Sequence, residues 1–371
     1  MAQQPADSNK VRFSIDGYIK NMPSLSFTSS FDTTRTLNLF HHRMRTKLEL
    51  PGNLSLKMEF RNRFFSGSQL QDGKSFGASL DRDDGLIDMS FVPLSGDNYV
   101  WHINIDRLYF NWSNKQWDIT AGRQRINWGV HTIWNPNDIF NAYNYLDFDY
   151  EERPGSDGIR IQYSGKNLSG LDVAWRIGKT HEDQIAALLY KFNKKEYDIQ
   201  LLAGVMKQDA VLGAGFAGNA GNAGLKGEAT WFHSLNAEAD TLNALSATIG
   251  IDYTNKHNWY FNGSYLYLSS GSNAADIVSM QLLGTTNAKN LLPFRHTIFA
   301  MANRTINPLL TAGISLMYAP GGRNYLILFP TVNYSVGANT ELSLFAQSLL
   351  GNDNRYKTLG TALYARVKWS F

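Results

Sequence analysis

Apolar and polar residues alternate along most of this chain, and this period of two limits what the chain can fold into. In 54-LSLKMEFRNRF-64, every second residue from Leu54 to Phe60 is apolar, and the residues between them are polar or charged. Such alternation is typical of a β-strand with one apolar and one polar face, whereas an amphipathic helix repeats every 3.6 residues. The stretch 357–371 repeats the pattern up to Phe371. The sequence therefore predicts an all-β protein.

Segments of this kind recur from residue 11 onwards, and their number is about 18, with 16 as an alternative. We interpret residues 1–10 as a flexible N-terminal segment and residues 11–371 as one domain. The predicted strands lie near 11–20, 36–49, 54–64, 99–112, 117–129, 158–164, 171–178, 184–193, 197–205, 209–217, 225–232, 245–253, 258–270, 292–304, 309–318, 323–335, 340–349 and 357–371.

The connections between these segments indicate how the strands are arranged. Every second link is short and rich in turn-forming residues, as in Pro51-Gly52-Asn53, whereas the others include long links near 66–97, 130–157 and 271–290. Short periplasmic turns and long extracellular loops are typical of a transmembrane antiparallel up-and-down β-barrel, which closes so that no backbone amide faces lipid unpaired. A soluble all-β repeat is the alternative, but no internal repeat of about 40–50 residues supports a propeller.

Composition narrows the classes of function. The chain has no cysteine, which excludes disulfide scaffolds and thiolate metal sites, and its net charge of +3 is too small to indicate a nucleic-acid partner. No apolar run approaches the roughly 18–20 residues of a membrane-spanning helix. Residues 1–10 lack the features of a signal peptide, so an outer-membrane destination implies that one has been removed. No cofactor is indicated.

Nine basic residues fall at positions predicted to point into the lumen, because a charge that faces lipid at the bilayer midplane costs about 2–4 kcal/mol. Two interpretations remain open. The residues form an electropositive arc that attracts anions, or, more plainly, carboxylates from neighbouring strands neutralise them. The nine are Arg43, Arg45, Lys47, Lys57, Arg61, Arg63, Arg123, Arg125 and Arg160.

The long link after the fifth predicted strand is rich in aromatic and acidic residues. Such a loop is costly to leave in solvent, so we expect residues 130–157 to fold on or into the barrel mouth, as a constriction or plug or as an ordered lid on the rim. The residues that would form it are Trp134, Asp138, Phe140, Tyr143, Tyr145, Asp147, Asp149, Glu151 and Glu152.

Two breaks in the alternation predict β-bulges. The apolar parity switches between Asp106 and Leu108, and it switches again near Gly122. A bulge inserts one extra residue into a strand and so restores the apolar face to one side. The second bulge would place Arg123 and Arg125 on the inward side.

Two weaker patterns suggest other chemistry. Asp81, Asp83 and Asp84 have a spacing that could hold Ca²⁺ through oxygen ligands, although the glycine and distal glutamate of a known calcium loop are missing. His102 and Asp106 share a strand face, as in a hydrolytic dyad, but a polar lining produces such pairs routinely. We therefore do not expect an enzyme or a dedicated metal site.

Two motifs carry a resemblance to a known family. The string 123-RQRINWG-129 followed by 135-NPNDIFN-141 resembles a pattern in a family of porin-like outer-membrane barrels, and 213-GAGFAGNAGNAGLKGEATWF-232 is similar to another segment of such barrels. The terminal Trp369 and Phe371 resemble the C-terminal signature that the barrel-assembly machinery reads. The resemblance implies a bacterial outer-membrane barrel that acts as a transport channel or passive pore, and it carries no particular solute.

These observations predict a porin-like channel for the passive diffusion of small hydrophilic solutes, with anions favoured by the basic residues. A barrel of 16–18 strands leaves room for an aqueous channel. It would contact outer-membrane lipid and lipopolysaccharide, and the assembly machinery during biogenesis. The alternative is an occluded barrel that acts as a structural or assembly component together with other envelope proteins or lipoproteins.

Overall fold

The computed structural model describes residues 10–28, 34–142, 155–235, 243–273, 287–352 and 355–371. Within them, nineteen strands form one sheet and a single α-helix, α1 (Gly73–Leu80), interrupts the β-structure. The strands are β1 (Arg12–Thr28), β2 (Thr34–Leu50), β3 (Leu54–Ser66), β4 (Ser90–Ser95), β5 (Tyr99–Ser113), β6 (Trp117–Gln124), β7 (Ser156–Ser164), β8 (Gly170–Arg176), β9 (Ile185–Lys194), β10 (Tyr197–Met206), β11 (Asp209–Ala220), β12 (Ala223–Ser234), β13 (Ala244–Thr254), β14 (Trp259–Leu268), β15 (His296–Asn307), β16 (Leu310–Ala319), β17 (Asn324–Gly337), β18 (Thr340–Asn352) and β19 (Tyr356–Ser370).

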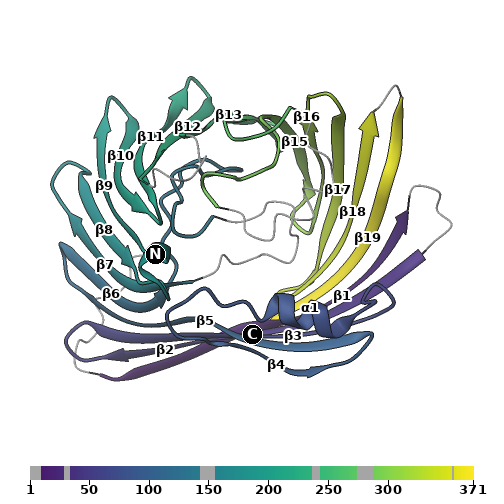
Figure 1. Cartoon of the computed structure of the whole chain (residues 1–371), viewed down its shortest axis with the longest axis horizontal. Coiled ribbons are helices and arrows are strands. Elements are labelled where there is room, and N and C mark those ends of the chain that lie inside the picture. The colour runs from purple at the N-terminus through teal and green to yellow at the C-terminus, as the bar shows by residue number, and fades with distance from the viewer. Residues whose placement is uncertain (1–9, 29–33, 143–154, 236–242, 274–286, 353–354) are drawn as a thin grey trace.

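The sheet closes into a barrel (Figure 1). Each wall strand pairs antiparallel with its neighbours in the chain, and β1 pairs with β19 from Tyr18–Ser370 to Thr28–Gly360. The exception is β4, which pairs with β5 and with no other described strand. Eighteen strands therefore form the wall, and the predicted all-β antiparallel barrel is confirmed. Among the described residues, no helix is long and apolar enough to cross a bilayer.

Alternating side chains divide the wall into two faces. Along β11 and β12 the apolar Leu212 and Trp231 are 56% and 39% exposed on the outside, whereas Glu228 and Thr230 are buried on the inside. Exposed apolar side chains on the outside and polar ones on the inside suit a wall between hydrocarbon and an aqueous lumen. The period of two in the sequence is the direct cause, because successive strand residues point to opposite faces.

The predicted loop 66–97 contains two elements that the sequence did not indicate. Asp72 caps α1 by accepting a hydrogen bond from the Ser75 amide at 3.0 Å. The helix packs on the inner face of the wall, with the ring of Phe76 at 5.2 Å from that of Phe65. The strand β4 pairs with the first half of β5, and β6 pairs with its second half.

One predicted bulge is present and the other is absent. The register between β3 and β5 shifts between Glu59 and Phe60, which leaves Asp106 as the extra residue and turns both Asp106 and Arg107 inward. By contrast, β6 pairs with β5 and β7 without a shift, although Gly122 has a φ of +121°. The expected bulge at Gly122 is therefore wrong, and Arg123 keeps the outward parity of Trp117.

Segments between strands turn into the barrel interior (Figure 1). Residues 125–142 leave the end of β6 and pack against the inner faces of other strands, where Ile126 and Trp128 join a buried apolar cluster. Leu291, Leu292 and Phe294 join a second buried cluster with inward side chains of β14–β17. Of the predicted segment 1–10, residues 1–9 lie outside the described residues.

Candidate functional site

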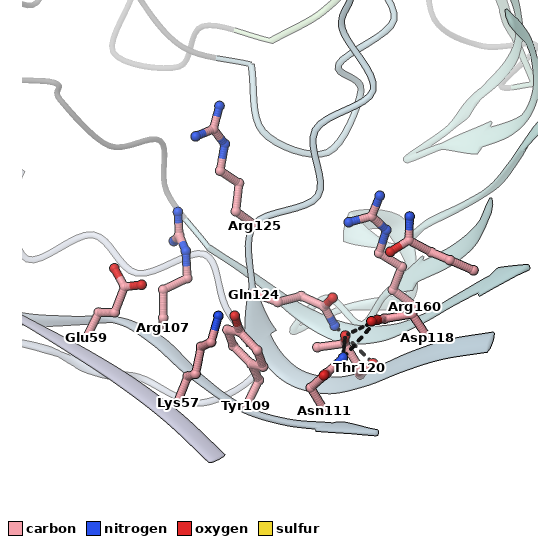
Figure 2. Close-up of a pocket in the computed structure, with 11 residues that line it drawn as sticks. Lys57, Glu59, Arg107, Tyr109, Asn111, Asp118, Thr120, Gln124, Arg125 and Arg160 are labelled. Carbon is pink, nitrogen blue, oxygen red and sulfur yellow. Dashed lines mark hydrogen bonds between the residues drawn. The ribbon is translucent and has the colours of Figure 1, made fainter. Parts of the chain in front are cut away.

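A polar cavity of about 360 Å³ lies against the inner face of four neighbouring strands, β3, β5, β6 and β7 (Figure 2). Its position follows from the alternation, because every second residue of these strands points into the lumen. Its lining residues are Lys57, Glu59, Arg107, Tyr109, Asn111, Asp118, Thr120, Gln124, Arg125, Arg160 and Gln162.

The bulge at Asp106 explains one lining residue that the sequence analysis did not name. Strict alternation along β5 would turn Arg107 outward. Because Asp106 is an extra residue, Arg107 points inward instead, opposite Glu59. The parity switch was the available signal, since it already required two successive inward residues. The polar lining residues Asn111, Thr120 and Gln124 were likewise not singled out.

Several cations of the predicted arc are neutralised by carboxylates. Arg43, which is 1% exposed, contacts Glu59 at 2.6 Å and Asp106 at 2.7 Å, and Arg61 contacts Asp106 at 3.0 Å. Buried charges require such partners, because an unpaired charge in a protein interior costs several kcal/mol. Further ion pairs join Arg45 to Asp16, Lys47 to Glu49 and Arg160 to Asp172.

Two cations of the cavity lack such a partner. Lys57 and Arg125 form no ion pair with any described residue, and Lys57 Nζ lies 5.8 Å from the centre of the Tyr109 ring. Figure 2 shows the side chains of Lys57, Arg107 and Arg125 extending in the same direction from the wall. Among the described lining residues, the only carboxylates are Glu59, which pairs with Arg43, and Asp118, which accepts a hydrogen bond from Asn111 at 2.8 Å. The described lining therefore carries excess positive charge.

Arg123 does not belong to this cavity, which corrects its predicted place in the lumen. It contacts Asp83 and Asp157 at 2.6 Å each, and it borders an apolar pocket beside the exposed Phe110 and Ile159. These partners lie on the outward side of the wall, where the segment 83–89 covers the guanidinium. Without a bulge at Gly122 the residue has the outward parity, so its charge is balanced locally.

The inward segment 125–142 presents two different sides. Trp134, Asp138 and Phe140 are buried, with Phe140 at 4.9 Å from the ring of Trp128. Arg125 is exposed and lines the cavity. The predicted loop residues therefore pack against the barrel, and the lumen-facing residue is one that was assigned to the basic arc. Tyr143, Tyr145, Asp147, Asp149, Glu151 and Glu152 lie outside the described residues.

The segment is attached to the wall by polar contacts. The Trp128 indole N–H donates to Asp172 of β8 at 3.0 Å, and Gln200 of β10 donates to the Trp128 carbonyl at 2.8 Å. Glu228 of β12 accepts three of the segment's backbone amides. The sequence analysis did not identify these anchors, because they lie far from the segment along the chain.

The hydrogen bonds around His102 on β5 do not suit nucleophilic catalysis. His102 lies 2.8 Å from the Ser90 hydroxyl through Nε2, and its Nδ1 lies 3.0 Å from an Arg63 nitrogen. Because arginine can only donate, Nδ1 accepts, and in the neutral ring Nε2 then carries the proton and donates to Ser90. A general base would have to accept the serine proton instead. Asp106 is held by Arg43 and Arg61.

The weak calcium pattern at Asp81, Asp83 and Asp84 does not assemble into a cluster of ligands in the described structure. Asp83 is engaged by Arg123 and by the amides of Gly85 and Met89 at 2.8 Å each. No cluster of three potential metal ligands occurs within the described part of the chain. Asp83 accepts four hydrogen bonds, two on each oxygen, so all of its lone-pair sites are occupied.

At the C-terminal end, Trp369 and Phe371 lie on the outer face and are 46% and 40% exposed. Phe371 exchanges two backbone hydrogen bonds of 3.0 Å with Gly17 of β1. Both aromatic residues therefore belong to the seam between the first and last strands. That the barrel-assembly machinery recognises Trp369 and Phe371 stays a prediction.

Searches with family models and among curated proteins found no match to this sequence. Solved structures do match in fold. The chain is similar to OpdQ of Pseudomonas aeruginosa (TM-score 0.62, 9% identity, 97% of this chain and 98% of that one) and to OccAB2 of Acinetobacter baumannii (TM-score 0.62, 9% identity, 97% and 98%). It is also similar to the outer membrane protein OprD of Pseudomonas aeruginosa (TM-score 0.60, 9% identity, 97% and 93%). At such identities the likeness establishes the fold alone.

Proposed function

We propose that this chain is a porin-like channel of a bacterial outer membrane that lets small hydrophilic solutes diffuse passively and favours anions. The observation that carries the proposal is the polar cavity inside a closed barrel, in which Lys57 and Arg125 have no ion-pair partner among the described residues. Cations that no carboxylate neutralises raise the local concentration of anions in a narrow pore. The shared fold with OprD, which is an outer membrane protein, supports the location.

The inward segment 125–142 is the proposed constriction; it overlaps the predicted loop 130–157 and begins five residues before it. It places Arg125 beside the cavity, and its buried side packs against the wall. A lumen narrowed by a fixed segment brings a passing solute close to the charged wall, where electrostatic selection is strongest.

Reversal-potential measurements in planar bilayers test this proposal. Replacing the two cations without partners (Lys57→Ala with Arg125→Ala) should shift the reversal potential in a salt gradient toward cations, because excess positive charge is removed from the pore. The control is Lys115→Ala with Lys195→Ala, which removes two exposed cations from short turns.

A shift of equal size in the control would show that overall charge, not the cavity, sets selectivity. Unchanged selectivity in the double variant would remove the basic cavity from the mechanism while leaving the fold intact. The wild-type protein should give ohmic steps of current in the bilayer. A folded barrel that conducts no current would contradict the channel function.

A second candidate function rests on a different observation. Two buried apolar clusters occupy the interior, one of them built partly from Leu291, Leu292 and Phe294. Such packing favours an occluded barrel that serves as a structural or assembly component with other envelope proteins or lipoproteins. A silent barrel that co-purifies with a stoichiometric partner would support this alternative.

A further inference from the structure

One buried carboxylate on the wall accepts three backbone amides of the inward segment. Glu228 lies on the inner face of β12 and is 3% exposed. Its Oε1 accepts from Val130 at 2.5 Å and from His131 at 2.6 Å, and its Oε2 accepts from Asn137 at 3.0 Å. Three hydrogen bonds from different amides fix the orientation of the segment as well as its position.

A second set of contacts lies beside this carboxylate. The Asn137 side chain, which is fully buried, donates to the Ala214 carbonyl at 3.1 Å and accepts from the Thr230 hydroxyl at 2.6 Å. Thr230 lies two residues after Glu228 on the same face of β12. The backbone and side chain of Asn137 are therefore both bound to the wall.

Glycines on β11 make room for this approach. A Cβ atom at Gly213 would lie 2.7 Å from Asn137 Oδ1, and one at Gly215 would lie 2.9 Å from Asn137 Nδ2. Both distances are too short for ordinary van der Waals contact, so a larger residue would displace Asn137. The glycine-rich segment 213–232 and the segment 135–141, which appear in the sequence as separate motifs, are the two halves of one contact.

We propose that Glu228 is the positioning residue of the constriction. Its carboxylate holds segment 125–142 against β11 and β12 and thereby keeps Arg125 beside the cavity. This inference rests on the proposed channel function, because it assigns the residue that sets the width of that channel. Removal of the carboxylate should release the segment and give a wider, less uniform pore.

Hydrogen exchange in Glu228→Gln tests the anchor without reference to conduction. The glutamine keeps the size of the side chain but replaces one acceptor oxygen with a donor, which faces the amide donors of the segment. The glutamine accepts through one oxygen only, so it cannot satisfy the amides of Val130, His131 and Asn137 together, and at least one of the three should exchange about tenfold faster or more. Glu341→Gln, which removes a carboxylate paired with Arg366 on β19, is the matched control. Unchanged exchange at the three amides would overturn the proposal.

Conductance then tests what the anchor does. Glu228→Gln should give higher and more variable conductance, and a disulfide between N137C and G213C in that variant should restore the uniform wild-type value until it is reduced. The natural chain has no cysteine to interfere. A disulfide that forms without changing conductance would overturn the positioning role.

Two further outcomes keep the proposals distinct. If Glu228→Gln does not fold, Gly213→Ala probes the same contact by crowding Asn137 and should speed exchange at the same amides; unchanged exchange there would contradict the anchor. If the wild-type barrel is silent in bilayers, the channel function fails, whereas the exchange data still decide whether Glu228 holds the segment.

Discussion

At the scale of single residues, Arg123 organises the outer face of the wall. It binds Asp83 and Asp157, and Asp83 also accepts the amides of Gly85 and Met89. Burial alone would raise the pKa of Asp83, but the hydrogen bonds from Arg123 and from the two amides outweigh it and hold that pKa below its ordinary value of 3.8. This carboxylate therefore ties the segment 81–89 to the wall.

The depressed pKa predicts a stability change at low pH. Because the pKa of Asp83 is lower in the folded than in the unfolded chain, its contribution is complete above the unfolded value of about 3.9 and is lost as the pH falls through the folded value. The amide NMR signals of Gly85 and Met89 should titrate together with a midpoint below 3.8. The titration should disappear in Asp83→Asn, and a midpoint at or above the ordinary value would contradict the assignment.

The inward or outward direction of most charged residues could be predicted from the alternation, as for Arg43 and Arg61, but two could not. Arg107 was missed because the bulge at Asp106 gives the strand two successive inward residues. Arg123 was misplaced because a bulge was assumed at Gly122, where the backbone adopts a positive φ without a shift in register. A parity switch shows that alternation fails, but it does not show how the backbone accommodates the failure.

At the scale of elements, the bulge in β5 supplies two functions with adjacent residues. Asp106 neutralises Arg43 and Arg61, and Arg107 lines the cavity. Deleting either residue restores strict alternation, so both deletions should leave the barrel closed. The two deletions are a matched pair, because one removes the ion-pair partner of the arginines and the other removes a cation that lines the cavity.

Deletion of Asp106 should destabilise the barrel by about 3–5 kcal/mol, because it removes the buried carboxylate that pairs with both Arg43 and Arg61. Deletion of Arg107 should destabilise the barrel much less, and it should instead change the ion selectivity of the channel. Urea unfolding of the two variants in detergent checks the difference. Equal losses of stability would mean that the bulge itself, and not the ion pairs, matters to the fold.

The elements that the sequence analysis missed are those without a clear period. The helix α1 has the sequence GKSFGASL, with two glycines in eight residues, and β4 contains Pro93, beside which its register with β5 shifts. Both gain their stability from packing on β5. By contrast, β5, β9, β10 and β11 lie within a few residues of their predicted positions, and exposed apolar side chains such as Phe110, Leu188 and Leu212 mark their outer face.

At the scale of the whole molecule, closure depends on the seam between β1 and β19. Gly17 exchanges backbone hydrogen bonds with Phe371, and a Cβ atom at Gly17 would lie 2.8 Å from the Phe371 ring. The ring therefore covers the glycine on the outer face, an arrangement in which an aromatic residue compensates for the missing side chain. The sequence predicted closure, because a free sheet edge would expose unpaired backbone amides to lipid, but it did not predict this contact.

Gly17→Val should weaken the seam by about 1–3 kcal/mol, because the new side chain overlaps the Phe371 ring and the Arg43 carbonyl. On a detergent gel, the band of the folded, compact barrel should then disappear after heating to a lower temperature than the wild type requires. Gly337→Val is the control, since nothing lies within 4 Å of a Cβ atom at that position. An equal drop in both variants would rule out a special role for the seam.

The enclosed segment also constrains the order of assembly. Residues 125–142 lie within a ring whose last bonds join the first strand to the final one, and they touch Glu228, some hundred positions later in the chain. Contacts between such distant positions form slowly, since the intervening polypeptide must first lose its freedom. The segment therefore has to reach β12 while the cylinder is still open, or be threaded through its mouth afterwards. Biogenesis and permeation thus depend on the same event.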